Sequence, residues 1–231
     1  MDIKLYYQEK GTGEPFLLLH GNGENSAYFK HQIADFQRSY RVIALDTRGH
    51  GKSPRGEAPF TIAQFSCDLF DFMQAHRIAK AVILGFSDGA NIAMAFAMKH
   101  PEMVTALILN GGNLCPAGVK RTTQIPIEIG YRIAKRFAAK SAEARRNAEM
   151  LGLMVNEPNI RPQELAQITA PTLVICGTRD MIKAAHSSAI AAALPNARLT
   201  VMRGTHFIAN QRPAEFNRTV GDFLKSLPGG N

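Results

Sequence analysis

Short apolar runs alternate with longer amphipathic segments along most of this chain. Six of these runs are rich in Val, Ile and Leu, and Gly, Pro, Asp or Asn residues bound them. Their apolar residues are consecutive rather than alternating, which is typical of parallel strands covered by helices on both faces. The sequence therefore predicts an α/β fold with a doubly wound, mostly parallel sheet. The expected strands are residues 15–21, 40–46, 80–86, 104–112, 171–177 and 197–204.

The first residues of the chain have a different pattern. Apolar and polar residues alternate more clearly in residues 3–10, and the sequence Gly-Thr-Gly follows them. Alternation favours a strand with one solvated face, and the glycines favour a turn. We therefore expect an antiparallel hairpin at one edge of the sheet.

One connection between expected strands is much longer than the others. Residues 113–170 form this insertion, whose nine Lys and Arg residues exceed its five Glu residues and give it a net charge of +4. We interpret it as a short helical lid within a single domain that spans residues 1–231. An apolar stripe at helical spacing indicates either core packing or a wall of the substrate site, and it makes Tyr131 and Phe137 the candidate substrate-binding residues. The stripe consists of Ile127, Tyr131, Ala134 and Phe137.

Composition narrows the class of protein. The 231 residues are 45% hydrophobic and contain no apolar run long enough to span a membrane. No basic segment followed by an apolar one opens the chain, so we expect a cytoplasmic protein. Cys67, Cys115 and Cys176 have no metal-ligand spacing, which predicts neither a disulfide nor a metal site. Because no long apolar run is present, we expect no membrane partner. The net charge of +8 is spread along the chain, so we expect no nucleic-acid partner.

Residues with catalytic potential follow five of the expected strands. The segments are HGNGEN, DTRGHGKS, GFSDGA, GTRD and GTHF. Because ligands bind at the carboxyl ends of the strands in open α/β sheets, these segments define the candidate site.

The segment GFSDGA places Ser87 between a strand and a helix. Gly85 and Gly89 permit a turn too tight for side chains, and such a turn presents the hydroxyl of Ser87 at the edge of the sheet. A serine there could also simply cap the helix. As a nucleophile it would need a base and a carboxylate that orients the base. Asp180 and His206 follow the last two expected strands, so the three residues occur in the chain order Ser, Asp, His. Their positions and this order together predict a catalytic triad.

Two backbone N–H groups could stabilise the negative oxygen formed when Ser87 attacks a carbonyl. The N–H of Asp88 lies at the start of a helix, where the helix dipole favours an anion. The HGNG segment offers the N–H of Asn22 as the second donor. We expect His20 to order this loop rather than to titrate during catalysis.

In this order, the five segments resemble the α/β-hydrolase superfamily over residues 15–226. The resemblance implies an α/β-hydrolase fold with Ser87 as nucleophile, Asp180 as acid, His206 as base, and Asn22 and Asp88 as oxyanion donors. It also implies that DTRGHGKS is mainly a structural loop bordering the site. Asp88 departs from many relatives, which have an apolar residue or Gln there. The Ser-Asp-Gly elbow is similar to that of biphenyl hydrolase-like enzymes, which are amino-acid ester hydrolases.

The sequence thus favours a serine hydrolase that cleaves a small carboxylic ester through an acyl-enzyme. We expect it to need neither a metal nor an organic cofactor and to be a monomer or homodimer. Thioesterase, amidase, C–C hydrolase and perhydrolase activities use similar residues and stay open. A nearly inactive ligand-binding or signalling protein on the same fold is the other alternative.

Overall fold

A seven-stranded sheet forms the centre of the molecule. The computed structural model describes residues 2–228, and the strand order is β1-β3-β2-β4-β5-β6-β7. Neighbouring strands are parallel except for β1 and β3. The doubly wound, mostly parallel sheet is therefore confirmed. The strands are β1 Tyr7–Lys10, β2 Pro15–Leu19, β3 Arg41–Leu45, β4 Ala81–Phe86, β5 Val104–Asn110, β6 Thr172–Gly177 and β7 Ala197–Met202.

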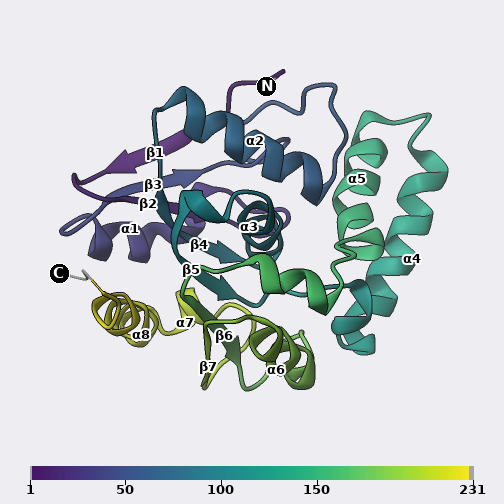
Figure 1. Cartoon of the computed structure of the whole chain (residues 1–231). Coiled ribbons are helices and arrows are strands. Elements are labelled where there is room, and N and C mark those ends of the chain that lie inside the picture. The colour runs from purple at the N-terminus through teal and green to yellow at the C-terminus, as the bar shows by residue number, and fades with distance from the viewer. Residues whose placement is uncertain (1, 229–231) are drawn as a thin grey trace.

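Helices cover both faces of this sheet (Figure 1). Alternate residues of a strand point to opposite faces, so Leu17 and Leu19 belong to one core cluster, and Phe16 and Leu18 to the other. The first cluster includes residues of α2, α3 and α6, and the second includes residues of α1 and α8. The helices are α1 Lys30–Phe36, α2 Ile62–Ala75, α3 Asp88–Lys99, α4 Arg121–Phe137, α5 Ala142–Asn156, α6 Ala184–Ala193, α7 Ile208–Gln211 and α8 Pro213–Lys225. Short 3₁₀ turns span Ser26–Phe29, Pro101–Met103, Pro116–Gly118 and Pro162–Gln167.

The N-terminal strand corrects one expectation. β1 is an antiparallel edge strand, as expected, but it does not form a hairpin with β2, the next strand in the sequence. It pairs with β3 instead, with Tyr7 opposite Leu45. β2 cannot accept it, because parallel strands β3 and β4 occupy both of its edges.

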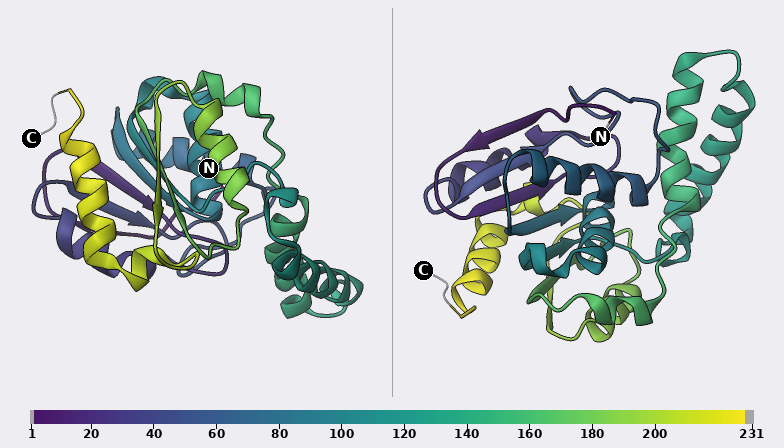
Figure 2. Two further views of the ribbon diagram at one scale, coloured as in Figure 1. Left: turned by 90° about the horizontal axis from the view of Figure 1, so that it is seen from below. Right: turned by 45° about the horizontal axis from the view of Figure 1, so that its top comes forward.

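The insertion at residues 113–170 contains α4 and α5, which pack together as a helical pair beside the sheet (Figures 1 and 2). The segments that precede α4 and follow α5 are joined, because the Ile160 N–H donates to the Leu114 carbonyl at 2.8 Å. Arg55 and Glu149 form an ion pair of 2.7 Å between the pair and the body. Within residues 2–228, no helix combines the length and apolarity needed to cross a bilayer.

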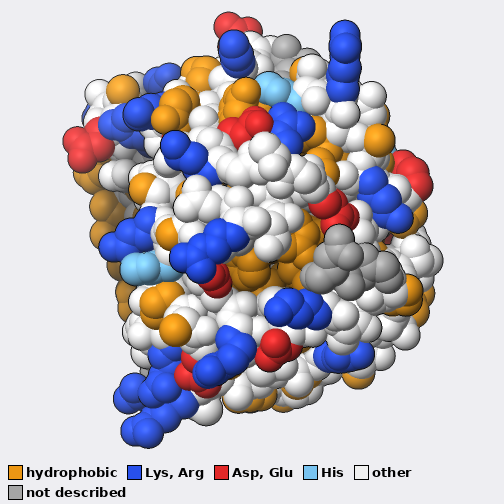
Figure 3. All heavy atoms as spheres, turned by 90° about the vertical axis from the view of Figure 1, so that its left-hand side faces the viewer, with side chains coloured by type: hydrophobic (Ala, Val, Ile, Leu, Met, Phe, Trp, Pro, Cys, Tyr) orange, Lys and Arg blue, Asp and Glu red, His pale blue; other side chains and the backbone are white. Residues whose placement is uncertain are grey.

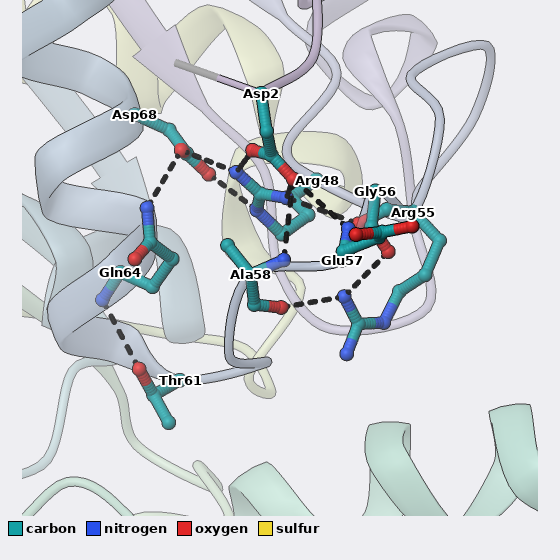
Figure 4. A network of polar contacts seen from close by, with 9 residues as sticks. All are labelled: Asp2, Arg48, Arg55, Gly56, Glu57, Ala58, Thr61, Gln64 and Asp68. Carbon is teal, nitrogen blue, oxygen red and sulfur yellow. Dashed lines mark hydrogen bonds and ion pairs between the residues drawn. The ribbon is translucent and has the colours of Figure 1, made fainter.

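A buried arginine organises the DTRGHGKS loop. The Arg48 side chain is fully buried and pairs with Asp68 of α2 and with Asp2, each at 2.6 Å (Figure 4). It also donates to the Arg55 carbonyl at 3.1 Å. Gln64 donates to the Asp68 carboxylate at 3.0 Å. These bonds connect the N-terminus, this loop and α2, which agrees with a structural role for the loop.

Asp68→Asn is expected to lower the free energy of unfolding by about 3 kcal/mol, because it leaves a buried guanidinium with one carboxylate instead of two. Urea denaturation measures this loss. Glu9→Gln is the matched control, since it removes the carboxylate of an exposed ion pair to Arg41, for which about 1 kcal/mol or less is expected. Equal, small losses in the two variants would show that Asp2 alone neutralises Arg48.

Candidate active site

Ser87 occupies a strained turn between β4 and α3. Its φ is 53° and its ψ is −120°. This backbone conformation costs a residue other than glycine about 1–3 kcal/mol. A Cβ atom at Gly89 would overlap the Leu19 carbonyl oxygen, and one at Gly85 would overlap that of Gly89. Ser87 precedes α3, but its side chain forms no capping hydrogen bond. The turn therefore does not use the hydroxyl as a helix cap, which leaves it available for chemistry.

Asp180 and His206 form a buried pair at the ends of β6 and β7. The Nδ1 atom of His206 lies 2.7 Å from Oδ1 of Asp180, and the two side chains are 5% and 2% exposed. Burial alone would raise the pKa of Asp180, but the hydrogen bond and charge of His206 and the N–H groups of Ile182 and Gly177 hold it below its ordinary value. An ionised Asp180 accepts the Nδ1 proton. The other ring nitrogen, Nε2, is then the basic one.

Packing holds this imidazole beside the serine turn. The His206 ring contacts Phe86, the residue before Ser87, with ring centroids 4.9 Å apart. Gly111 also lies against this ring, since a Cβ atom at that position would approach it to 2.6 Å. Nε2 is buried and has no hydrogen-bond partner among the described residues. A base whose proton-accepting atom is unoccupied thus lies next to the turn that carries a free hydroxyl.

The two expected oxyanion donors lie on adjacent segments. Asp88 begins α3, and a Cβ atom at Gly89 would come within 2.7 Å of the His20 carbonyl oxygen, so the start of α3 touches the loop that contains Asn22. His20 orders this loop: it accepts from the Thr47 N–H at 3.0 Å and donates to the Gly21 carbonyl at 2.7 Å. Burial lowers the pKa of His20 to about 4, which keeps it neutral. This agrees with the structural role expected for His20.

The Asn22 side chain makes a contact that the sequence does not indicate. Its amide donates to the Met150 carbonyl of α5 at 2.7 Å. The loop expected to supply an oxyanion donor is therefore joined directly to the insertion. No local sequence pattern relates these positions, which are separated by 128 residues.

A buried polar network surrounds Asp88, and it was not predicted from the sequence. Asn91 donates to Oδ1 of Asp88 at 3.1 Å and to Oδ1 of Asn113 at 3.0 Å. Oδ2 of Asp88 is buried without a hydrogen bond. Burial raises the pKa of Asp88 to about 6, although the amides of Asn22 and Asn91 oppose this increase. The spacing of Asp88 and Asn91, three residues apart at the start of a helix, was the available signal.

The two candidate substrate-binding residues of the insertion lie in different surroundings. Tyr131 is half-buried and borders a groove of about 360 Å³, together with Phe60 and Glu149. Phe137 is 48% exposed, and it does not border this groove. The structure thus brings Tyr131, but not Phe137, to a cavity.

No metal-binding arrangement is found in residues 2–228, where no group of three or more His, Cys, Asp or Glu residues could hold an ion. The cysteines are free: Cys67 is exposed, Cys115 half-buried and Cys176 buried. The reactive groups described above are a hydroxyl, an imidazole and carboxylates.

Comparison with known proteins identifies the family of this chain. The model of the alpha/beta hydrolase fold family matches residues 14–150. Human serine hydrolase BPHL is 27% identical over 249 residues, covering 96% of this chain and 84% of that protein. The 3-oxoadipate enol-lactonase 2 of Acinetobacter baylyi is 27% identical over 256 residues, covering 97% and 94%. The structure of an esterase from Exiguobacterium antarcticum superimposes with a TM-score of 0.83 at 21% identity, covering 97% and 96%.

Proposed function

Because this chain belongs to the alpha/beta hydrolase fold family, and named relatives are hydrolases, we propose that it is a serine hydrolase that cleaves a small carboxylic ester. The observation that supports this most directly is the buried pair of Asp180 and His206, 2.7 Å apart, beside the strained turn of Ser87. A buried imidazole with an ionised carboxylate on one nitrogen and nothing on the other has the properties of a general base.

In the proposed reaction, Oγ of Ser87 attacks the ester carbonyl carbon while Nε2 of His206 takes the hydroxyl proton. The carbonyl oxygen becomes negative and accepts hydrogen bonds from the N–H groups of Asn22 and Asp88. Collapse of this intermediate breaks the bond to the alcohol oxygen, which receives the proton from His206. Water then attacks the acyl-enzyme while His206 takes one of its protons. The bond between the acyl carbon and Oγ breaks, and His206 returns this proton to Oγ as the carboxylic acid leaves.

Labelling with a fluorophosphonate tests the nucleophile. The reagent forms a phosphonyl ester only with an activated serine, so we expect one labelled peptide, containing Ser87, after digestion and mass spectrometry. Heat-denatured protein and Ser87→Ala should stay unlabelled. A folded wild-type chain without label would instead favour a ligand-binding or signalling protein with negligible turnover.

The groups described would serve several related chemistries as well as ester cleavage. Thioesters, amides and cyclic esters are attacked by the same atoms and differ in the leaving group. The relatives include an enol-lactonase and proteins named as carbamate hydrolases. Matched acetyl substrates, an oxygen ester, a thioester and an anilide, distinguish these activities by their kcat/KM values.

The surroundings of Asp88 support a second, narrower proposal, in which the substrate is an ester whose acyl group carries an amino group. One oxygen of this buried carboxylate has no hydrogen-bond partner, and a substrate ammonium would supply one. The Ser-Asp-Gly elbow and the similarity to BPHL agree with this assignment. The net charge of +4 on the insertion opposes it unless those cations face solvent.

Asp88→Asn is expected to lower kcat/KM for alanine ethyl ester at least about tenfold and to spare ethyl propionate, which lacks only the amino group. Because the pKa of Asp88 is raised to about 6, the carboxylate is neutral below that pH and charged above it. The preference of the wild type for the amino ester should therefore increase as the pH rises through about 6. Equal slowing of both esters by the variant would make Asp88 a structural residue only.

A further inference from the structure

Helix α4 carries a row of apolar side chains on its solvent side. Ile125, Ile129, Ile133 and Phe137 are 41%, 52%, 56% and 48% exposed. Residues four apart lie on the same face of a helix, and twelve residues span about 18 Å, so these side chains form one continuous stripe. We call it the α4 stripe. The other exposed large hydrophobic residues of the described chain are Leu199, Val201 and Phe207, at 37%, 56% and 45%.

The α4 stripe has no partner within the described part of the chain. The opposite side of α4, with Gln124 buried and Ile127, Tyr131 and Ala134 half-buried, packs on α5. α5 in turn contacts the body through Met150 and Glu149 (Figure 1). α4 is therefore the outer helix of the pair, and its stripe faces away from the rest of the molecule. A helix of a globular protein ordinarily turns its apolar side inward.

Cations accompany the α4 stripe. Arg132 and Arg136 are exposed and directly precede Ile133 and Phe137, and Lys140 is exposed just beyond the end of the helix. The one acidic residue of α4, Glu128, is half-buried. On the face of the molecule away from α4, by contrast, Lys and Arg are scattered and acidic residues lie between them (Figure 3). The outer side of α4 is thus both apolar and positively charged.

We propose that the outer face of α4 docks on an anionic lipid surface. Apolar side chains on one face with Lys and Arg at its borders are typical of helices that lie in the plane of a membrane interface. The apolar side chains would enter the headgroup region, while the arginines extend to lipid phosphates. A second copy of this chain fits less well, because it would bring Arg132 and Arg136 against their own counterparts. Nucleic acid would satisfy the cations and leave the apolar side chains without a partner.

The expectation of no membrane partner rested on the absence of a long apolar run. That absence excludes a spanning helix but not an interfacial one, whose apolar residues are four apart and separated by polar ones.

Sedimentation with vesicles tests the proposal. The full chain is expected to sediment with vesicles of equimolar phosphatidylglycerol and phosphatidylcholine and to stay in the supernatant with phosphatidylcholine alone. The pair Ile129→Asn and Ile133→Asn should weaken binding at least about tenfold. The pair Arg132→Gln and Arg136→Gln should weaken it similarly, and raising the salt concentration should weaken wild-type binding.

Two control pairs lie elsewhere on the surface. The variant with Leu199→Asn and Val201→Asn removes exposed apolar side chains of β7. The variant with Arg203→Gln and Arg218→Gln removes exposed cations. Both variants should bind vesicles as the wild type does. If the variant with Ile129→Asn and Ile133→Asn does not fold, the variant with Ile125→Asn and Phe137→Asn removes the other two side chains of the α4 stripe. Absence of binding to anionic vesicles, or unchanged binding by the stripe or arginine variants, would overturn the proposal. So would light scattering that shows a dimer which the stripe variants dissociate, since a second copy would then occupy this face.

Discussion

Ser87→Ala is expected to lower the kcat for a small ester at least about 10³-fold while leaving the fold intact. No other hydroxyl can take its place, because the turn fixed by Gly85 and Gly89 holds this one position at the ends of the strands. Hydrolysis of a chromogenic acetate measures the loss, and the melting temperature reports the fold. A rate within tenfold of wild type would mean that Ser87 is only a turn residue.

Ser87→Gly provides a matched control for strain. It also lacks the nucleophile, so the same loss of activity is expected. Glycine adopts a φ of 53° without strain, however, and this variant should unfold at a higher temperature than Ser87→Ala. Equal melting temperatures would show that the turn stores no strain at this residue.

Asp180→Asn is expected to lower kcat at least about 10²-fold, although Asp180 does not react. In the wild type this carboxylate accepts three hydrogen bonds, from Nδ1 of His206 and from the N–H groups of Ile182 and Gly177. The amide of Asn has only one accepting oxygen, and its NH₂ group would face a donor. The imidazole would then carry its proton on Nε2, where it cannot receive the proton of Ser87.

Asp180→Asn also distinguishes a role in orienting His206 from a role in stabilising the fold. The melting temperature and the rate of fluorophosphonate labelling are measured together, with Asp222→Asn on α8 as a control outside the pair. A folded variant with slow labelling is expected. Full activity would mean that another acidic residue orients His206.

Much of the fold follows from local patterns. Consecutive apolar residues predicted β2 to β6, because a strand buried on both faces has no polar side. They also predicted β7, although it is an edge strand whose residues are mostly exposed or half-buried. Ser87, Asp180 and His206 could be proposed together because the ends of parallel strands meet at one edge of the sheet. That step needs only the order of the strands in the sequence.

What was missed depends on contacts between distant segments. β1 alternates as an edge strand should, but the choice of β3 over β2 as partner depends on which edges remain open. On α4, apolar residues occur on both sides of the helix, so the pattern could not decide which side packs. Phe137 was grouped with Ile127 and Tyr131, and it lies instead in the exposed row with Ile133. The contact from Asn22 to Met150 likewise has no local signal.

The bond between the segments before α4 and after α5 favours exchange of the helical pair between related proteins. Because Leu114 and Ile160 bond to each other at 2.8 Å, the segment between them leaves the sheet and returns at one place. Its length and sequence can then change by recombination, or by exchange in the laboratory, while β5 and β6 keep their register. A transplanted segment would have to match the positions on the body that hold the present one, which include Asn22, Arg55, Ile62 and Met181. The joint at which such an exchange would be made is therefore a backbone hydrogen bond that involves none of the residues proposed to be catalytic.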